Sequence, residues 1–341
     1  MIQKQKTWSQ FIVETALPEG FRASLGEAIE CEAFIPPLSP ASLDQRSGWV
    51  LPDNMLSTDF GNQDAWLFNQ YVVLALRIDQ KKLPAKLYAA TVKSRCAAWC
   101  AAQSRAKCPA AVKLEITEQV KLEMAPNVLP TTSLVWAVWN INDGGVVVFT
   151  HAEGALDTFR KKFRRTFSVG LTPDELNRNY VEEEAHPAWY CKTFLRWLWH
   201  RGEEASFVGR SWWVSNRIVM QGPNDEKPTI VLSGDNGHRG QAAKAATLAN
   251  YSPSSLRLWV RSDDREYEFT LTDDLRIAGA KLPALVKTGE AAEILYERMY
   301  LIEDLDSHLR EMFAEFEYIH KDQELRASFE KAVVDWAQEQ E

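Results

Sequence analysis

The clearest pattern of hydrophobic and polar positions lies between Ser133 and Leu171. Residues 133–140 are dense in β-branched and aromatic side chains, and a second apolar run at 146–149 follows the turn sequence Asn-Asp-Gly-Gly at 142–145. An Asp-Gly pair between two such runs favours a tight hairpin, because glycine readily adopts the positive φ that the turn requires. The pattern therefore predicts two antiparallel strands joined by a short turn.

A helix is predicted directly after this hairpin. Thr150 stands three residues before Glu153, which is the spacing of an N-terminal capping box. Apolar residues then recur at helical spacing, at positions 156, 159, 163 and 167. The rest of that helix surface is basic and comprises Arg160, Lys161, Lys162, Arg164 and Arg165. We expect the apolar stripe to pack on the sheet, while the cationic face is either merely solvated or binds phosphate groups.

A second basic region surrounds a predicted strand and the helix after it. The apolar run at 71–78 is short enough for a buried strand, and a proline suited to a first helical turn opens a helix predicted over 84–102. A further helix is predicted over 110–124. Arg95 falls on the apolar side of the first of these helices, and the pattern offers no reason for it. The candidate phosphate-binding residues of this region are Arg77, Lys81, Lys82, Lys86 and Lys93.

The rest of the chain mixes predicted strands and helices without any long-period repeat, so we expect an α+β fold built of several antiparallel hairpin-plus-helix units. Strands are predicted near 8–14, 212–220, 229–232, 256–260 and 267–271, and helices before 34, after 290 and over 321–340. We divide the sequence into five regions: 1–132 with the basic strand and helix, 133–185 with the central hairpin and basic helix, an aromatic- and glycine-containing region at 186–250, a C-terminal α+β region at 251–316 and a charged helical extension at 317–341.

Composition indicates a soluble protein, and the uneven distribution of charge along the chain bears on whether it can bind nucleic acid. The chain has 341 residues, 45% hydrophobic and 25% charged, and five cysteines, which is typical of a soluble protein with free thiols in a reducing compartment such as the cytoplasm. Its net charge of −8 argues against a nucleic-acid partner at first sight. However, residues 290–341 hold 15 acidic and 5 basic side chains, whereas residues 75–113 hold nine basic side chains and one acidic one. Such segregation allows a cationic surface on an acidic protein.

Three stretches together resemble the RdgC family of recombination-associated DNA-binding proteins. They are Phe34-Ile35-Pro36 with Gly48-Trp49-Val50, the segment from Val73 through Lys81-Lys82-Leu83-Pro84 and its helix, and the central hairpin with its helix. The hairpin and terminal helix at 256–316 also look like the C-terminal part of that family, and the order fits over residues 10–316. The resemblance implies a ring-shaped homodimer that encloses duplex DNA without sequence preference, restrains a RecA-type recombinase and is associated with the nucleoid. It also implies a strand at 298–303, with the last helix beginning near Asp304.

The sequence departs from this family at two places. The loop before the central hairpin carries an aromatic side chain in the family that can wedge into DNA, whereas the loop at 126–132 has none. Leu129 is the candidate apolar wedge, because aliphatic side chains also unstack base steps. Residues 200–250 match the family poorly and leave the contact that would close the ring unassigned.

Two alternatives to DNA binding remain open, a nuclease and a protein-interaction module. We nevertheless expect no catalysis and no cofactor. A Mg²⁺-dependent nuclease would need clustered carboxylates, which Asp225-Glu226 beside Lys227 offers only in a predicted turn. A protein-interaction module could act through the acidic residues 290–341. We expect no metal, since Cys96, Cys100 and Cys108 lack the paired spacing usual at zinc sites. Trp212-Trp213 suggests either a stacking platform for single strands or a dimer contact.

Overall fold

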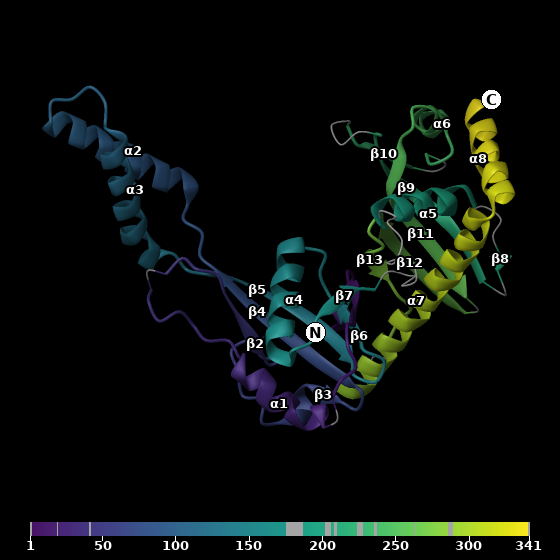
Figure 1. The fold of residues 1–341 in the computed structure, drawn as a ribbon, viewed down its shortest axis with the longest axis horizontal. Coiled ribbons are helices and arrows are strands. Elements are labelled where there is room, and N and C mark those ends of the chain that lie inside the picture. Colours follow the sequence, from purple (N-terminus) through teal and green to yellow (C-terminus); the bar gives the residue numbers. More distant parts are fainter. Residues whose placement is uncertain are drawn as a thin grey trace. The chain divides into compact units, whose positions relative to one another are not determined.

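The chain folds into two compact units, each assembled from segments that are distant in the sequence (Figure 1). The computed structural model describes residues 2–18, 20–40, 42–174, 187–201, 206–207, 210–223, 228–234, 237–262, 264–285 and 289–339. Unit 1 comprises Met1–Ile12, Gly145–Ala152 and Thr172–Glu341, and unit 2 comprises Val13–Gly144 and Glu153–Leu171. Both contain helices and antiparallel strands, which confirms the predicted α+β class.

Unit 2 contains an antiparallel sheet in the strand order β2-β4-β5, with the short β3 also paired to β4. Its strands are β2 (Arg46–Val50), β3 (Leu67–Phe68), β4 (Tyr71–Gln80) and β5 (Thr131–Asn140). Its helices are α1 (Phe21–Cys31), α2 (Ala85–Ala102), α3 (Ala110–Met124) and α4 (Glu153–Phe167), with short 3-10 turns η2 (Gln63–Ala65) and η3 (Ala125–Asn127). The strand predicted over 71–78 and the helices predicted over 84–102 and 110–124 are thereby confirmed.

The aromatic stripe of α4 forms the core between this helix and the sheet. Leu156, Phe159, Phe163 and Phe167 are all buried, as their helical spacing predicts. The ring of Phe163 lies 5.0 Å from that of Trp139 on β5, and the ring of Phe159 lies 5.6 Å from that of Trp49 on β2. Edge-to-face packing of this kind adds about 1 kcal/mol per pair beyond the area that it buries. The stripe therefore determines which side of α4 faces outward.

Gly48 lies on β2 where two backbones come close together. A Cβ atom at this position would lie 2.3 Å from the Cα atom of Phe34. The adjacent Trp49 forms a parallel bridge with Ala33, and its indole Nε1 donates a hydrogen bond of 2.7 Å to Thr166 Oγ1 on α4. Only glycine fits this approach, so the Gly-Trp-Val motif joins the segment after α1 to the sheet and to α4.

Unit 1 contains a second antiparallel sheet in the order β10-β9-β11-β12-β13, with β8 also paired to β9, and its strand β1 pairs antiparallel with β6. The helices α5 and α7 lie against one face of the second sheet (Figure 1). The strands are β1 (Ser9–Val13), β6 (Gly145–Val148), β7 (Leu171–Pro173), β8 (Ser206–Phe207), β9 (Arg210–Gln221), β10 (Ile230–Ser233), β11 (Ser252–Ser262), β12 (Arg265–Thr272) and β13 (Ile277–Lys281). The helices are η1 (Ile2–Lys4), α5 (Pro187–Arg201), α6 (Gln241–Leu248), α7 (Ala291–Lys321) and α8 (Gln323–Gln338).

The strand at 298–303 that the family resemblance implies is wrong. These residues lie inside α7, which is continuous from Ala291 to Lys321. Neither glycine nor proline interrupts this segment, and a capping box between Glu290 and Glu293 begins the helix. Its buried residues, including Leu295, Met299 and Ile302, follow helical spacing. The hydrophobic period alone, which predicts helix from residue 290 onward, gives the correct structure.

Within the charged segment, the described residues 317–339 are packed against the rest of unit 1. Residues 317–321 continue α7, and α8 contacts both α6 and α7. Val333 and Ala337 of α8 are buried, and the ring of Trp336 lies 5.7 Å from that of Trp199 on α5. None of the helices in the described ranges is both long and apolar enough to cross a membrane.

Candidate nucleic-acid interface

A group of positive charges without ion-pair partners lies along and just before α2. Lys82, Lys86 and Lys93 are exposed, and within the described part of the chain none of them has an ion-pair or hydrogen-bond partner. The helix itself contains no acidic residue. Lysines without a neighbouring carboxylate keep their full charge available to an anionic partner, so this row is the best candidate for phosphate contacts.

Three further cations lie on the same helix pair and were not among the predicted site residues. Arg105 and Lys107 lie in the loop between α2 and α3, Lys113 lies on α3, and all three are exposed. The sequence indicated these three residues only through the count of nine basic side chains between residues 75 and 113. A loop has no periodicity from which the orientation of its side chains could be predicted. We include them in the candidate surface, called the hairpin surface: Lys82, Lys86, Lys93, Arg105, Lys107 and Lys113.

Two of the predicted phosphate contacts instead hold unit 2 together. Arg77 forms an ion pair of 2.7 Å with Asp79, and its guanidinium lies 4.2 Å above the ring of Phe34. Burial alone would raise the pKa of Asp79, but hydrogen bonds from Arg77 and Thr132 outweigh it and leave this pKa below its usual value. Lys81 donates to the carbonyl oxygen of Pro40 at 2.7 Å. Both side chains are therefore committed to internal contacts.

Arg95 has a structural role that the sequence pattern did not reveal. Its guanidinium donates to both carboxylate oxygens of Glu123, one of them at 2.9 Å, and so joins α2 to α3. Hydrogen bonds from Arg95 lower the pKa of Glu123. Arg95 points toward α3 because Glu123 lies there. This ion pair explains why a cation stands on the side of α2 that packs against α3.

The basic surface of α4 is only partly turned outward. The side chain of Lys162 is 12% exposed and forms an ion pair of 2.8 Å with Glu32, which also contacts Arg165 at 2.5 Å. Lys161 is exposed but pairs with Asp157 at 2.7 Å, one turn earlier. The side chain of Arg160 donates to the carbonyl oxygen of Leu171, and Arg164 is exposed with no partner among the described residues. The prediction that all five cations face outward therefore does not hold for Lys162.

Replacement of Lys162 tests this inward contact. Lys162→Glu places a second carboxylate beside Glu32 in a largely buried setting, and we expect it to lower the free energy of unfolding by about 2 kcal/mol. Urea denaturation followed by circular dichroism measures the change. Arg164→Glu on the same helix is the matched control and should change stability by less than about 0.5 kcal/mol. Equal stability of both variants would contradict the structural role of Lys162.

The two basic regions form separate patches within unit 2. Figure 1 shows α2 with α3 at one end of this unit and α4 against the sheet. Leu129, the candidate wedge, is 86% exposed in the loop between η3 and β5. An exposed leucine is common at protein surfaces, so its role in DNA binding stays a prediction.

The remaining candidate features do not assemble into a second site. Trp212 is buried and Trp213 points to the other face of β9, where its ring stacks with that of Trp259 at 6.1 Å, so the two adjacent tryptophans do not form one platform. The Asp-Glu-Lys sequence at 225–227 lies outside the described residues. Among the residues that the structure describes, no group of three or more histidine, cysteine or acidic side chains could hold a metal ion.

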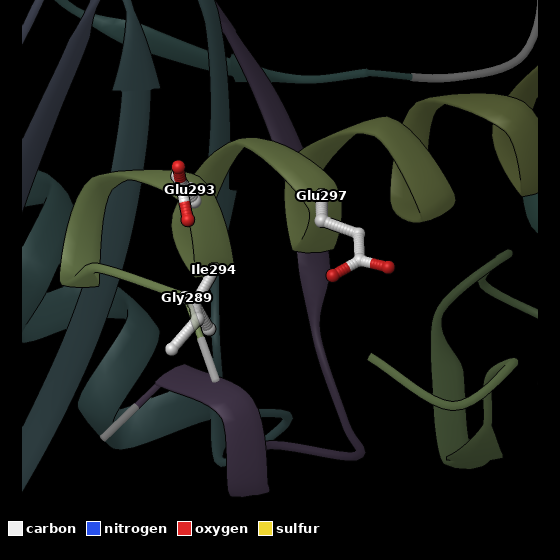
Figure 2. A pocket seen from close by; sticks show the side chains of 4 residues that line it. All are labelled: Gly289, Glu293, Ile294 and Glu297. Carbon is white, nitrogen blue, oxygen red and sulfur yellow. The ribbon is translucent and has the colours of Figure 1, made fainter. Parts of the chain in front are cut away.

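A hollow of about 270 Å³ lies at the start of α7 and is lined by Gly289, Glu293, Ile294 and Glu297. Figure 2 shows the carboxylates of Glu293 and Glu297 pointing in different directions from the helix. Glu293 already accepts a hydrogen bond of 3.1 Å from the backbone N–H of Glu290. An acidic lining of this kind is unsuited to phosphate, so the hollow is not part of the proposed interface.

Comparison with protein families and with curated proteins finds no match for this chain. No protein-family model matches the chain, and no curated protein matches it significantly. A functional conclusion therefore rests on the residues themselves and on the sequence resemblance described above.

Proposed function

We propose that this chain binds double-stranded DNA without sequence preference, as a ring-like homodimer of RdgC type, and thereby restrains RecA-type recombination in the nucleoid. The observation that carries the proposal is the uncompensated row of Lys82, Lys86 and Lys93. Sequence-independent binding requires cations that reach phosphates and does not require side chains that read base edges. The row meets this requirement.

The spacing within the row suits a backbone contact. Lys86 and Lys93 are two helical turns apart on α2, which corresponds to roughly 10 Å along the helix axis. Flexible lysine side chains can adapt from this spacing to neighbouring phosphates on one strand. Arg105 and Lys107 add two exposed cations in the loop beyond the end of α2.

The division of charge between the units supports a binding surface on unit 2. Unit 2 has 17 basic and 16 acidic side chains and so a net charge of +1, whereas unit 1 has 22 basic and 31 acidic side chains and a net charge of −9. Acidic residues elsewhere repel DNA and so favour approach through the hairpin surface. A two-fold dimer would double this surface, and the RdgC resemblance supplies the expectation of a closed ring.

The test is fluorescence anisotropy of two unrelated labelled duplexes without magnesium. We expect equal affinities for both, falling about 40-fold or more between about 50 and 200 mM salt if the three lysines of one chain each release a phosphate counterion. A salt-independent affinity, or binding to one duplex alone, would contradict a backbone clamp.

Two additions to this experiment discriminate between DNA binding, a nuclease and a protein-interaction module: magnesium in the duplex assay, and a recombinase in the absence of DNA. Loss of the labelled duplex only when magnesium is added would indicate a nuclease. Absence of DNA binding at low salt, together with binding to a recombinase in the absence of DNA, would indicate a protein-interaction module. Acidic side chains of α7 such as Glu315 and Asp306 already form ion pairs with Arg201 and Arg310, which weakens the case for that module.

A further inference from the structure

Three of the five cysteines gather where α2 ends and α3 begins. Cys96 and Cys100 lie one turn apart on α2, and Cys108 lies just before α3. The loop between the helices folds back on α2, since the backbone N–H of Arg105 donates a hydrogen bond of 2.9 Å to the carbonyl oxygen of Cys100. All three side chains are partly exposed, so a soluble oxidant can reach them.

Packing places Cys96 and Cys108 against the same small core. Both contact the cluster formed by Val92, Ile116 and Val120 between α2 and α3. Burial raises the pKa of the Cys108 thiol, and the nearby Cys96 thiol raises it further, with a smaller contribution from Cys100. Two independent features, the shared core and the thiol interaction, thus single out Cys96 as the main neighbour of Cys108.

We propose that Cys96 and Cys108 form a reversible disulfide, an oxidation site that joins the end of α2 to the start of α3. A peroxide is the oxidant: two S–H bonds break, one S–S bond forms, and hydrogen peroxide takes up the two electrons and two protons to yield two waters. A thiol reductant reverses the step by exchange. Cys100, one turn from Cys96, stays a free thiol in this pairing.

The location of the Cys96–Cys108 disulfide determines how it changes the motion of the loop between α2 and α3. It closes the loop that carries Arg105 and Lys107, and it restricts separation of α2 from α3. We expect amide hydrogen exchange across residues 96–113 to slow about tenfold on oxidation, because the closed loop limits local opening. Faster exchange after oxidation would show that the thiols pair only in a distorted hairpin and would overturn the proposal.

Peptide mapping tests the pairing directly. The experiment uses the full chain with Cys31→Ser, because Cys31 is the exposed cysteine outside the cluster, whereas Cys191 is buried. Mild hydrogen peroxide should lower the number of free thiols in this variant from four to two, counted after denaturation so that the buried Cys191 is included. After denaturation and complete trypsin digestion, the peptide Cys96–Arg105 should remain linked to the peptide Cys108–Lys113 until reductant is added.

Single substitutions discriminate between the possible pairs. The link should persist in Cys100→Ser and disappear in Cys108→Ser and Cys96→Ser. A link that survives in Cys96→Ser would assign the bond to Cys100 and overturn the proposed pair. Oxidation that leaves all four thiols reactive, or that yields only links between two chains, would overturn the site itself. None of these readouts depends on DNA binding, so the outcome is independent of the proposed function.

Discussion

Charge reversal of Lys82, Lys86 and Lys93 together is expected to weaken duplex binding about 100-fold or more at roughly 100 mM salt. Each substitution to Glu removes one cation from the hairpin surface and adds a charge that repels phosphate. The three side chains form no hydrogen bond or ion pair within the described residues, so their replacement should leave the fold intact. The dependence of affinity on salt should become shallower by nearly one phosphate per lysine. Anisotropy titrations over a range of salt concentrations measure both effects.

The control for this variant alters the net charge equally but on unit 1. Lys6, Arg326 and Lys331 are exposed there, and their joint replacement by Glu should change duplex affinity by less than about fivefold, through the weaker long-range field alone. Equal losses in the two triple variants would mean that net charge and not the hairpin surface governs binding. Unchanged affinity in the Lys82, Lys86 and Lys93 variant would remove α2 from the proposed interface.

Trp336→Ala is expected to lower the free energy of unfolding of unit 1 by about 3 kcal/mol. The indole of Trp336 lies edge-on to Trp199 at 5.7 Å and 5.0 Å from the ring of His200, and the cations of Arg239 and Lys244 lie within 6 Å of its face, at 5.7 and 5.8 Å. Truncation removes both the aromatic packing and the cation–π contacts. Urea denaturation followed by far-ultraviolet circular dichroism measures the loss, since a fluorescence signal would change with the substitution itself.

A second readout links this loss to the local environment of His200. Burial, aided by Arg239 and Arg196, lowers the pKa of His200 to about 3. Opening the site to water in Trp336→Ala should raise this pKa toward its usual value, which a histidine-resolved NMR titration reports. Lys331→Ala on the exposed side of α8 is the control and should alter neither quantity. A stability loss below about 1 kcal/mol would show that α8 packs only loosely. Deletion of 321–341 would remove all of α8 together with these contacts, so the point substitution is the cleaner test.

Sequence patterns anticipated the elements whose side chains alternate regularly between core and solvent. The four apolar residues of α4, the strand at 71–78 and the helices at 84–102 and 110–124 are all as predicted. The helical period also identified α7 correctly, where the family resemblance did not. These predictions succeeded because the period of burial is a local property: 3.6 residues per turn in a helix and two in a strand.

Contacts between residues far apart in the chain decided which cations are available. Lys162 shares a helix with Arg164, yet it faces Glu32, a residue 130 positions earlier. Arg77 and Lys81 are occupied by Asp79 and by the carbonyl oxygen of Pro40. A count of basic residues could not separate these side chains from Lys82 and Lys86, because an ion pair depends on a partner that only the folded chain brings near.

The sequence by itself determined the α+β class, the helices α2, α3, α4, α7 and α8 and the gathering of positive charge before residue 170, since these follow from local spacing and composition. It did not predict α5 or α6. The tertiary structure alone decided that α8 is packed through Trp336 and that Cys96 and Cys108 share a core between α2 and α3. It also decided that Lys82, Lys86 and Lys93 stay unpaired at the surface, whereas Lys162 is held by Glu32. Packing between helices and pairing between distant charges depend on how the chain returns on itself. The hydrophobic periodicity of a single helix or strand carries no information about which distant segments it will contact.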